Sequence, residues 1–221
     1  MIRATLPATP ARAPRSTPQT VAANTSTRPY VPPFAIQVDT REGAPYSFAG
    51  LHANSDRNYR PIAVQVVHQC LSTGDYSLYG HSDRITIERK SLADLMGSLA
   101  GEGGERRRRF KEEHERMYLQ YTLFGRPAHV VIEATPADVR AYRDNLPAGC
   151  VTGAHPTAVL STSIRWPRRY GVQWHWAGSR SDAERMVYDL LAHEWELIEE
   201  EKREAERAER QAAIQSLKKQ L

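Results

Sequence analysis

Cysteine and long apolar runs are both scarce in this chain of 221 residues, which contains two cysteines. Cys70 and Cys150 show no Cys-x-x-Cys spacing, which argues against a zinc site and against a disulfide framework. No stretch approaches the roughly 18 consecutive apolar residues of a membrane span. We therefore expect a protein of a reducing cytoplasm, with no membrane partner.

Acidic side chains are absent from residues 1–33, which consist mainly of Pro, Thr, Ala and Arg without a hydrophobic period. Such a segment cannot bury enough apolar surface to offset the entropy lost on ordering. We predict a disordered tail and exclude it from the fold. A transit peptide is the alternative, but the many prolines make a poor amphipathic helix.

Positive charge exceeds negative charge only slightly, with 30 Lys and Arg against 26 Asp and Glu and a net charge of +4. This excess is compatible with a nucleic-acid partner but does not demonstrate one. The length suits one catalytic domain with appendages. We expect one domain at residues 34–198 and a charged helical extension at residues 199–221, which is either a solvated helix or an oligomerisation arm.

Apolar segments with strand and helix periods alternate along the domain, which predicts an α/β fold with a central mixed sheet flanked by helices. Ser91 and Ser181 are the expected helix N-caps. The expected strands are residues 34–38, 62–67, 76–79, 84–90, 128–133 and 172–176, and the expected helices are 92–99, 105–121, 156–163 and a long one after Ser181.

A β-hairpin supplies the strongest functional signal. A four-residue turn at Gly80–Asp83 pairs Tyr79 with Arg84, and the same register brings Asp75 opposite Glu88. Like charges that face each other across a sheet repel, so a cation usually neutralises them. Carboxylate oxygens suit Mg²⁺ or Mn²⁺.

Lys90 lies two residues after Glu88, so the strand period of two places its ammonium on the same face as both carboxylates. Hydrolysis of a phosphodiester needs a metal ion together with a cation that stabilises developing negative charge. Asp75, Glu88 and Lys90 meet these needs. The alternative is a surface salt bridge on an exposed hairpin.

Three segments extend this pattern and resemble, in order, the motifs of the XPF-type (xeroderma pigmentosum group F) nuclease domain with its restriction-endonuclease-like active site. The resemblance covers residues 34–133 and implies a restriction-endonuclease-like fold. No Gly-x-Gly signature of helix-hairpin-helix repeats follows Glu133, so a compact standalone member of bacterial or phage type is expected. The matching segments are Val38–Glu42, Gly74–Leu78 and Ile87–Leu95.

The resemblance also implies residue roles. Asp75 and Glu88 would bind the metal with the backbone carbonyl of Arg89, and Lys90 would orient water or stabilise the transition state. Asp39 and Glu42 would add acidic groups to the cluster. The alternative for these last two residues is a turn, where Asp and Glu are frequent.

Two further groups of residues are expected to support the site. Arg89 should point to the face opposite Lys90 and could pair with Asp94 at the start of the next helix. Arg106–Arg109 are expected to contact DNA phosphates. The alternative for Arg106–Arg109 is a solvated helix face paired with nearby glutamates, Glu113 among them.

The resulting hypothesis is an endonuclease dependent on Mg²⁺ or Mn²⁺, without a small-molecule cofactor, that cuts branched or otherwise structured DNA. It would serve repair, recombination or phage replication in the cytoplasm of a bacterial or phage-infected cell and associate with the nucleoid when bound to DNA. A homodimer is expected. The alternatives are a non-catalytic DNA-binding or scaffold subunit, and a coiled-coil interaction protein based on the C-terminal helix.

Overall fold

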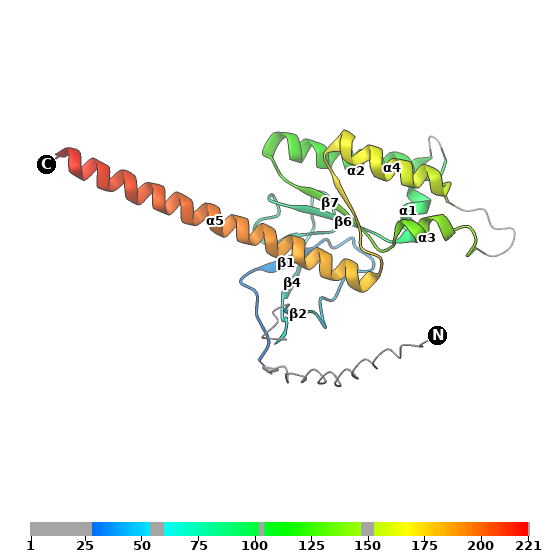
Figure 1. Cartoon of the computed structure of the whole chain (residues 1–221), viewed down its shortest axis with the longest axis horizontal. Coiled ribbons are helices and arrows are strands. Elements are labelled where there is room, and N and C mark those ends of the chain that lie inside the picture. Colours follow the sequence, from blue (N-terminus) through cyan, green and yellow to red (C-terminus); the bar gives the residue numbers. More distant parts are fainter. Residues whose placement is uncertain (1–27, 54–59, 102–103, 147–152, 221) are drawn as a thin grey trace, which may run out of the picture.

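The computed structural model describes residues 28–53, 60–101, 104–146 and 153–220, without the side chains of residues 121, 219 and 220. Most of the expected tail, and Cys150, lie outside these ranges. Figure 1 shows the arrangement. The elements in chain order are β1 (Ala35–Val38), β2 (His52–Ala53), β3 (Arg60–Pro61), β4 (Gln65–His68), β5 (Tyr76–Leu78), β6 (Thr86–Lys90), α1 (Leu92–Ser98), α2 (Glu105–Phe124), β7 (Ala128–Ile132), α3 (Pro136–Ala141), α4 (Pro156–Tyr170), β8 (Gln173–Trp176) and α5 (Arg180–Gln220).

A six-stranded mixed sheet in the order β4-β1-β5-β6-β7-β8 forms the centre of the domain. Strand β5 runs antiparallel to β1 and β6, whereas β6, β7 and β8 are mutually parallel. The predicted α/β class with a mixed sheet is confirmed. The predicted strand at residues 62–67 is displaced, because the observed β4 pairs with the edge of β1 only from Gln65 to His68.

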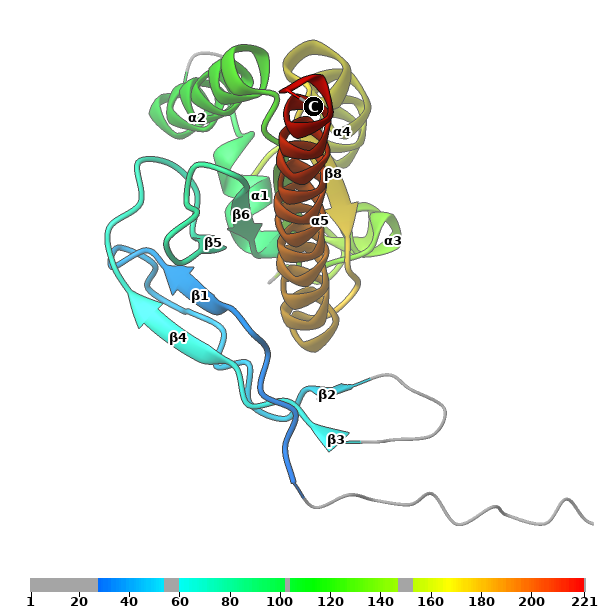
Figure 2. The same cartoon turned by 90° about the vertical axis from the view of Figure 1, so that its left-hand side faces the viewer.

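Both faces of the sheet are covered, as strand β7 shows. All five of its residues are buried, which requires apolar partners on each side. Val131 belongs to the core beneath α5, whereas Val130 and Ile132 belong to the core formed with α1, α2, α3 and α4. Figures 1 and 2 show α2 and α4 lying side by side over their part of the molecule.

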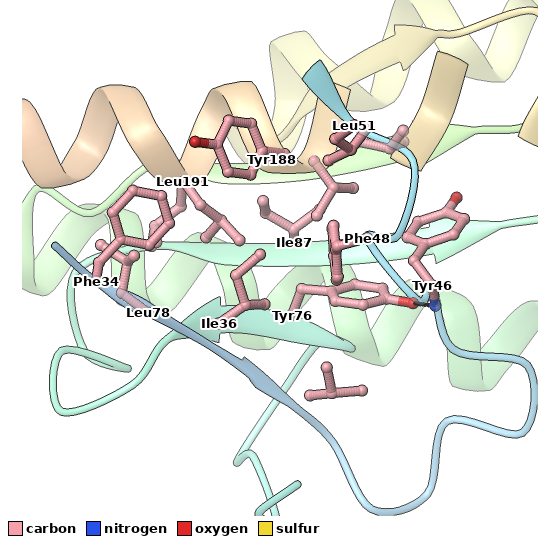
Figure 3. Packing of buried hydrophobic residues seen from close by; sticks show 14 of the residues in the cluster. Phe34, Ile36, Tyr46, Phe48, Leu51, Tyr76, Leu78, Ile87, Tyr188 and Leu191 are labelled. Carbon is pink, nitrogen blue, oxygen red and sulfur yellow. Dashed lines mark hydrogen bonds between the residues drawn. The ribbon is translucent and has the colours of Figure 1, made fainter. Parts of the chain in front are cut away.

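Helix α5 packs its first half against the sheet. Leu191 and Tyr188 point from α5 toward side chains of the strands (Figure 3), and the rings of Phe34 and Tyr188 lie 5.9 Å apart. Leu191 is fully buried. Beyond Glu199 every α5 residue whose side chain is described is exposed, and this half projects away from the domain in Figure 1.

Helix capping explains one correct and one wrong expectation. Ser91 is the N-cap of α1, where its side chain accepts a hydrogen bond from the backbone N–H of Asp94. The expectation that Ser181 caps α5 is wrong. Ser179 does so, because its hydroxyl accepts the backbone N–H of Asp182 at 3.1 Å.

Helices α3 and α4 differ most from the expectation. Helix α3 is not among the expected helices, although a capping box between Thr135 and Asp138 marks its start. The expected end of α4 at Ser163 is also wrong, since the helix continues to Tyr170 and stops at Gly171 with φ 63°. Pro167 lies inside that extension, where it removes only one backbone donor near the helix end.

No helix in the described ranges is both long and apolar enough to span a membrane.

The packing of α5 generates a stability prediction. Leu191→Ala should lower the free energy of unfolding by about 2–5 kcal/mol, because it empties a fully buried site between α5 and the sheet. Leu197→Ala on the same helix, at a position 38% exposed, should cost less than about 1 kcal/mol. Urea unfolding followed by circular dichroism measures both values. Equal losses would contradict the packing described for α5.

Candidate active site

Glu88 and Lys90 lie two residues apart on β6 and face the layer of α1 and α2. In the parallel ladder they lie beside Val130 and Ile132, which pack against these helices. The Lys90 Nζ lies 2.7 Å from the Glu88 Oε1, and both side chains are largely buried. The same Nζ lies 4.6 Å from the centre of the Phe110 ring. The predicted pair is therefore brought together, and it is buried rather than on an exposed hairpin.

Asp75 joins this pair through the register of the hairpin. The pairing of Tyr76 with Ile87 has the predicted register, and just before it the backbone N–H of Asp75 donates to the Ile87 carbonyl at 2.8 Å. The Asp75 Oδ2 accepts the backbone N–H of Arg89 at 2.8 Å. Burial, and then the nearby Glu88 carboxylate, raise the pKa of Asp75 to about 9.

Gly74 permits this approach of the two strands. It has φ +74°, and a Cβ at this position would lie 2.6 Å from the Thr86 Cγ2. Only glycine tolerates both the backbone conformation and the contact. The glycine before Asp75 is thus required by the geometry that brings the carboxylates together.

A third carboxyl group, Glu113 of α2, also lies at this site. Burial and the neighbouring Glu88 carboxylate raise its pKa to about 8. The expectation that Glu113 belongs to a solvated helix face is wrong, because burial and Glu88 dominate its surroundings. Helical spacing could have revealed the inward position of Glu113, because it lies between the buried Phe110 and Met117 on one side of the helix.

Lys90 is the cation that these carboxyl groups surround. Burial lowers its pKa, but the charges of Glu88 and Glu113 outweigh burial, and the net shift is upward. Lys90 is therefore an ammonium ion at neutral pH. Its position between β6 and α2 is fixed on one side by Glu88 and on the other by the Phe110 ring.

Arg89 points to the opposite face of the sheet, as predicted, but its partner is not Asp94. Its Nε donates to the Glu133 Oε1 at 2.7 Å, and its Nη1 lies 3.3 Å from the Glu42 Oε1. Arg180 adds a second cation to Glu133 at 2.9 Å. The expected pair with Asp94 is wrong because that exposed carboxylate accepts the Ser91 hydroxyl at the start of α1.

Asp39 is directed into a turn. Its carboxylate accepts hydrogen bonds from the guanidinium of Arg41 at 2.8 Å and from the backbone N–H of Leu71 at 2.7 Å. The bond from Arg41 holds its pKa at about 2. The backbone N–H of Asp39 donates to the carbonyl of Asp75 at 2.9 Å, so the turn is anchored directly beside the site. The role of Asp39 as an added acidic group of the active site remains a prediction.

Glu42 contacts both the turn that follows β1 and the guanidinium of Arg89. Its Oε1 accepts the backbone N–H of Ala44 at 2.6 Å and lies close to Arg89. Its charge also contributes to the raised pKa of Asp75. The charge of Glu42 therefore helps to raise the pKa of Asp75, and its hydrogen bond to Ala44 supports the turn.

The donor set fits a divalent cation in its chemistry. Asp75 and Glu88 offer hard oxygen ligands. Burial, and then the nearby Glu88 carboxylate, raise the pKa of Asp75, and a bound cation would relieve the repulsion between the two carboxylates. Within the described ranges, no group of three or more His, Cys, Asp or Glu side chains is gathered closely enough to hold a metal ion. Further ligands would have to be backbone carbonyls or water. The Arg89 carbonyl remains a prediction.

The four arginines of α2 separate into different surroundings. Arg106 and Arg109 line a hollow of about 310 Å³ together with Lys90, Glu113 and Arg116. Arg107 lines a different hollow on the α4 side. Arg108 is paired with Glu105 at 2.6 Å and is exposed. The expected four-residue DNA contact is therefore divided between two surfaces, and contact with DNA remains a prediction.

Three buried or half-buried histidines have structural partners. The Nδ1 of His114 donates to the Phe110 carbonyl at 2.8 Å, and its Nε2 accepts the indole N–H of Trp174 at 3.0 Å. Burial lowers the pKa of His114 to about 4. His129 and His175 hydrogen-bond to each other at 3.0 Å. These rings are neutral at pH 7.

Comparison with known proteins identifies the family. The ERCC4 domain model matches residues 38–190. Similar solved structures are XPF from Aeropyrum pernix, with TM-score 0.48, and the same protein in complex with DNA, with TM-score 0.47. Each is 19% identical, and the alignments cover 71% and 72% of this chain but 63% of each Aeropyrum pernix chain. No curated protein matches.

The matched residues run from the end of β1 into α5 and include the whole carboxylate cluster, so the chain belongs to the ERCC4 domain family, the family of XPF-type nuclease domains.

Proposed function

We propose that this protein is a metal-dependent endonuclease that hydrolyses phosphodiester bonds in branched or otherwise structured DNA. The observation that carries the proposal is the grouping of Asp75, Glu88 and Lys90, with Lys90 lining a hollow edged by arginines. Membership of a nuclease family supports the same conclusion.

A Mg²⁺ or Mn²⁺ ion held by Asp75 and Glu88 would polarise a phosphoryl oxygen and lower the pKa of a water molecule. Glu88 lies on β6, and Asp75 immediately precedes β5, the strand that pairs with β6. The hydrogen bond from the Arg89 backbone N–H to the Asp75 carboxylate holds Asp75 beside β6. The two carboxylates repel each other, and a bound cation would relieve this repulsion.

Lys90 supplies positive charge to the developing negative charge of the phosphoryl group. It is an ammonium in a largely buried place, and a charge acts more strongly where water is excluded. The Phe110 ring limits its movement. Arg106, Arg109 and Arg116 line the same hollow as Lys90, where they can orient flanking phosphates.

Glu113 holds a proton at this site. With a pKa of about 8, it is mostly uncharged at neutral pH and adds no second full negative charge beside Glu88. It keeps Glu88 in place through hydrogen bonding rather than by charge, which makes it a positioning residue.

Several expectations remain predictions that follow from the resemblance. They are the homodimer, the pathway (repair, recombination or phage replication), and the cytoplasmic, nucleoid-associated location in a bacterial or phage-infected cell.

Cleavage assays test the proposed activity. Wild-type protein should cut labelled forked or flapped DNA with Mg²⁺ or Mn²⁺ and not with EDTA, and Asp75→Asn should reduce the rate by a factor on the order of 10²–10³ or more. The matched control is Asp83→Asn, which removes the same charge from the exposed turn of the same hairpin and should leave the rate unchanged. Binding without cleavage under every metal condition would instead support a scaffold subunit.

The buried Asp75 also generates a pH prediction for metal-free protein. Folded Asp75 keeps its proton up to a pH of about 9, whereas its ordinary value is 3.8. The folded state therefore binds more protons between these values, and the free energy of unfolding falls as the pH rises, by at most about 1.4 kcal/mol per pH unit for one group. Asp75→Asn removes this dependence.

Urea unfolding in EDTA at pH 6 and at pH 8.5 measures the effect. Relative to wild type, Asp75→Asn should gain stability at the higher pH, and Mn²⁺ should stabilise wild type far more than the variant. Asp83→Asn again serves as control. Identical pH dependence in wild type and Asp75→Asn would show that Asp75 is ionised in the metal-free fold.

The positioning role of Glu113 predicts a contrast between two substitutions. Glu113→Gln keeps an uncharged hydrogen-bonding group and should retain cleavage to within about tenfold, whereas Glu113→Leu removes the hydrogen bond to Glu88 and should lose more. Cleavage rates from pH 6 to pH 9 separate the two. Glu112→Gln, on the exposed side of the same helix, is the control. A larger loss in Glu113→Gln than in Glu113→Leu would refute this role.

A further inference from the structure

A second hollow, of about 600 Å³, lies between α2 and α4 on the side of α2 away from Lys90. None of the described residues that line it is acidic. Five are basic, and they come from both helices. They are Arg107, Lys111, Arg165, Arg168 and Arg169. We name this hollow the α2–α4 groove.

Four of these cations have no ion-pair partner. In the part of the chain that the structure describes, no carboxylate lies within 4.0 Å of the guanidinium of Arg107, Arg165, Arg168 or Arg169, and Lys111 pairs with Glu115. Elsewhere on α2, in contrast, both Arg108 and Arg109 pair with Glu105. The positive charge of the groove is therefore largely uncompensated within the protein.

The helix dipole explains only part of this arrangement. Arg168 and Arg169 occupy the last turn of α4, where a cation is favoured by the partial negative charge of the helix end. Arg107 belongs to the first turn of α2, where the dipole disfavours a cation, but its guanidinium donates to the carbonyl of Leu99 at the end of α1 at 3.5 Å. Arg165 lies a turn before the end of α4, and its position requires another reason for positive charge.

The spacing of the cations fits a repeating anion rather than a single one. Arg107 and Lys111 lie four residues apart on α2, and Arg165 and Arg169 lie four residues apart on α4. Each pair is thus separated by about one turn, roughly 5–6 Å along its helix. The two helices present two such rows across the groove, which matches a polymer that carries one negative charge per repeat.

The groove is joined to the candidate active site through a shared aromatic layer. Trp166 lines the groove, and its ring lies 5.5 Å from the ring of Phe110. Phe110 in turn contacts the ammonium of Lys90 at 4.6 Å. Helix α2 is therefore the wall between the two hollows, with Arg106 on one side and Arg107 on the other.

We propose that the α2–α4 groove binds the phosphodiester backbone of a DNA segment outside the cleavage site, across α2 from the carboxylate cluster. This rests on the proposed nuclease function, because the same DNA molecule would occupy both hollows. The contacts are to phosphates, so they position DNA without reading its sequence.

The test is a binding measurement that does not depend on cleavage. Fluorescence anisotropy in EDTA with labelled forked DNA compares wild type with Arg165→Gln/Arg168→Gln over a range of KCl concentrations. The double variant should weaken binding on the order of tenfold and reduce the slope of log Kd against log[KCl] by about 1.8, or 0.9 for each lost phosphate contact. Both proteins should melt at the same temperature by circular dichroism.

A matched control separates the groove from net charge. Arg207→Gln/Arg210→Gln removes the same charge from the exposed end of α5 and should leave binding unchanged. If wild type binds DNA and the groove variant matches the α5 control, the groove proposal is wrong while the nuclease proposal stands.

Two further outcomes would overturn the groove proposal. Displacement of DNA by inorganic phosphate at constant ionic strength would indicate a small-anion site. Binding of an acidic peptide such as poly-glutamate, with no binding of DNA, would indicate a protein partner and would contradict the nuclease proposal as well.

Discussion

The period of two along β6 is the constraint on which the candidate site depends. Both faces of the central strands are covered, so each residue of β6 is committed to one of two enclosed environments. Glu88 and Lys90 enter the environment beneath α2, and Arg89 enters the one beside α5. A shift of one residue in the register with β5 would exchange these environments and separate Asp75 from Glu88.

The two environments handle charge in opposite ways. Around Arg89 the charges are matched, since Glu133 faces both Arg89 and Arg180 and accepts the hydroxyl of Tyr46. Although burial opposes ionisation, these partners lower the pKa of Glu133. Beneath α2 the carboxyl groups outnumber the cation, and the pKa values of Asp75 and Glu113 are raised. The paired charges around Arg89 therefore stabilise the fold, whereas the excess of carboxyl groups beneath α2 favours the approach of a cation.

Local patterns were enough to predict the hairpin and its Tyr76–Ile87 register, because strand alternation places the polar and apolar residues. The connection between β5 and β6 runs over residues 79–85 and is longer than the expected four-residue turn. Local patterns also predicted the Ser91 cap and the side of the sheet to which Arg89 points. Contacts between distant elements were not predictable in this way. Glu113 looked like one member of a charged helix, and its meeting with Glu88 depends on how α2 packs on the sheet. The choice of Glu133 over Asp94 as the partner of Arg89 likewise depends on β7 lying next to β6.

Helix α5 is continuous from its packed half to Gln220, and this continuity has a geometric consequence. The stretch after Glu199 is about 30 Å long at 1.5 Å per residue, and it has no hinge of glycine or proline. Anything joined to its far end would be carried at a set distance from the sheet and at a set angle around the helix axis. Inserting one residue would turn that attachment by about 100°, whereas inserting seven would nearly restore its direction.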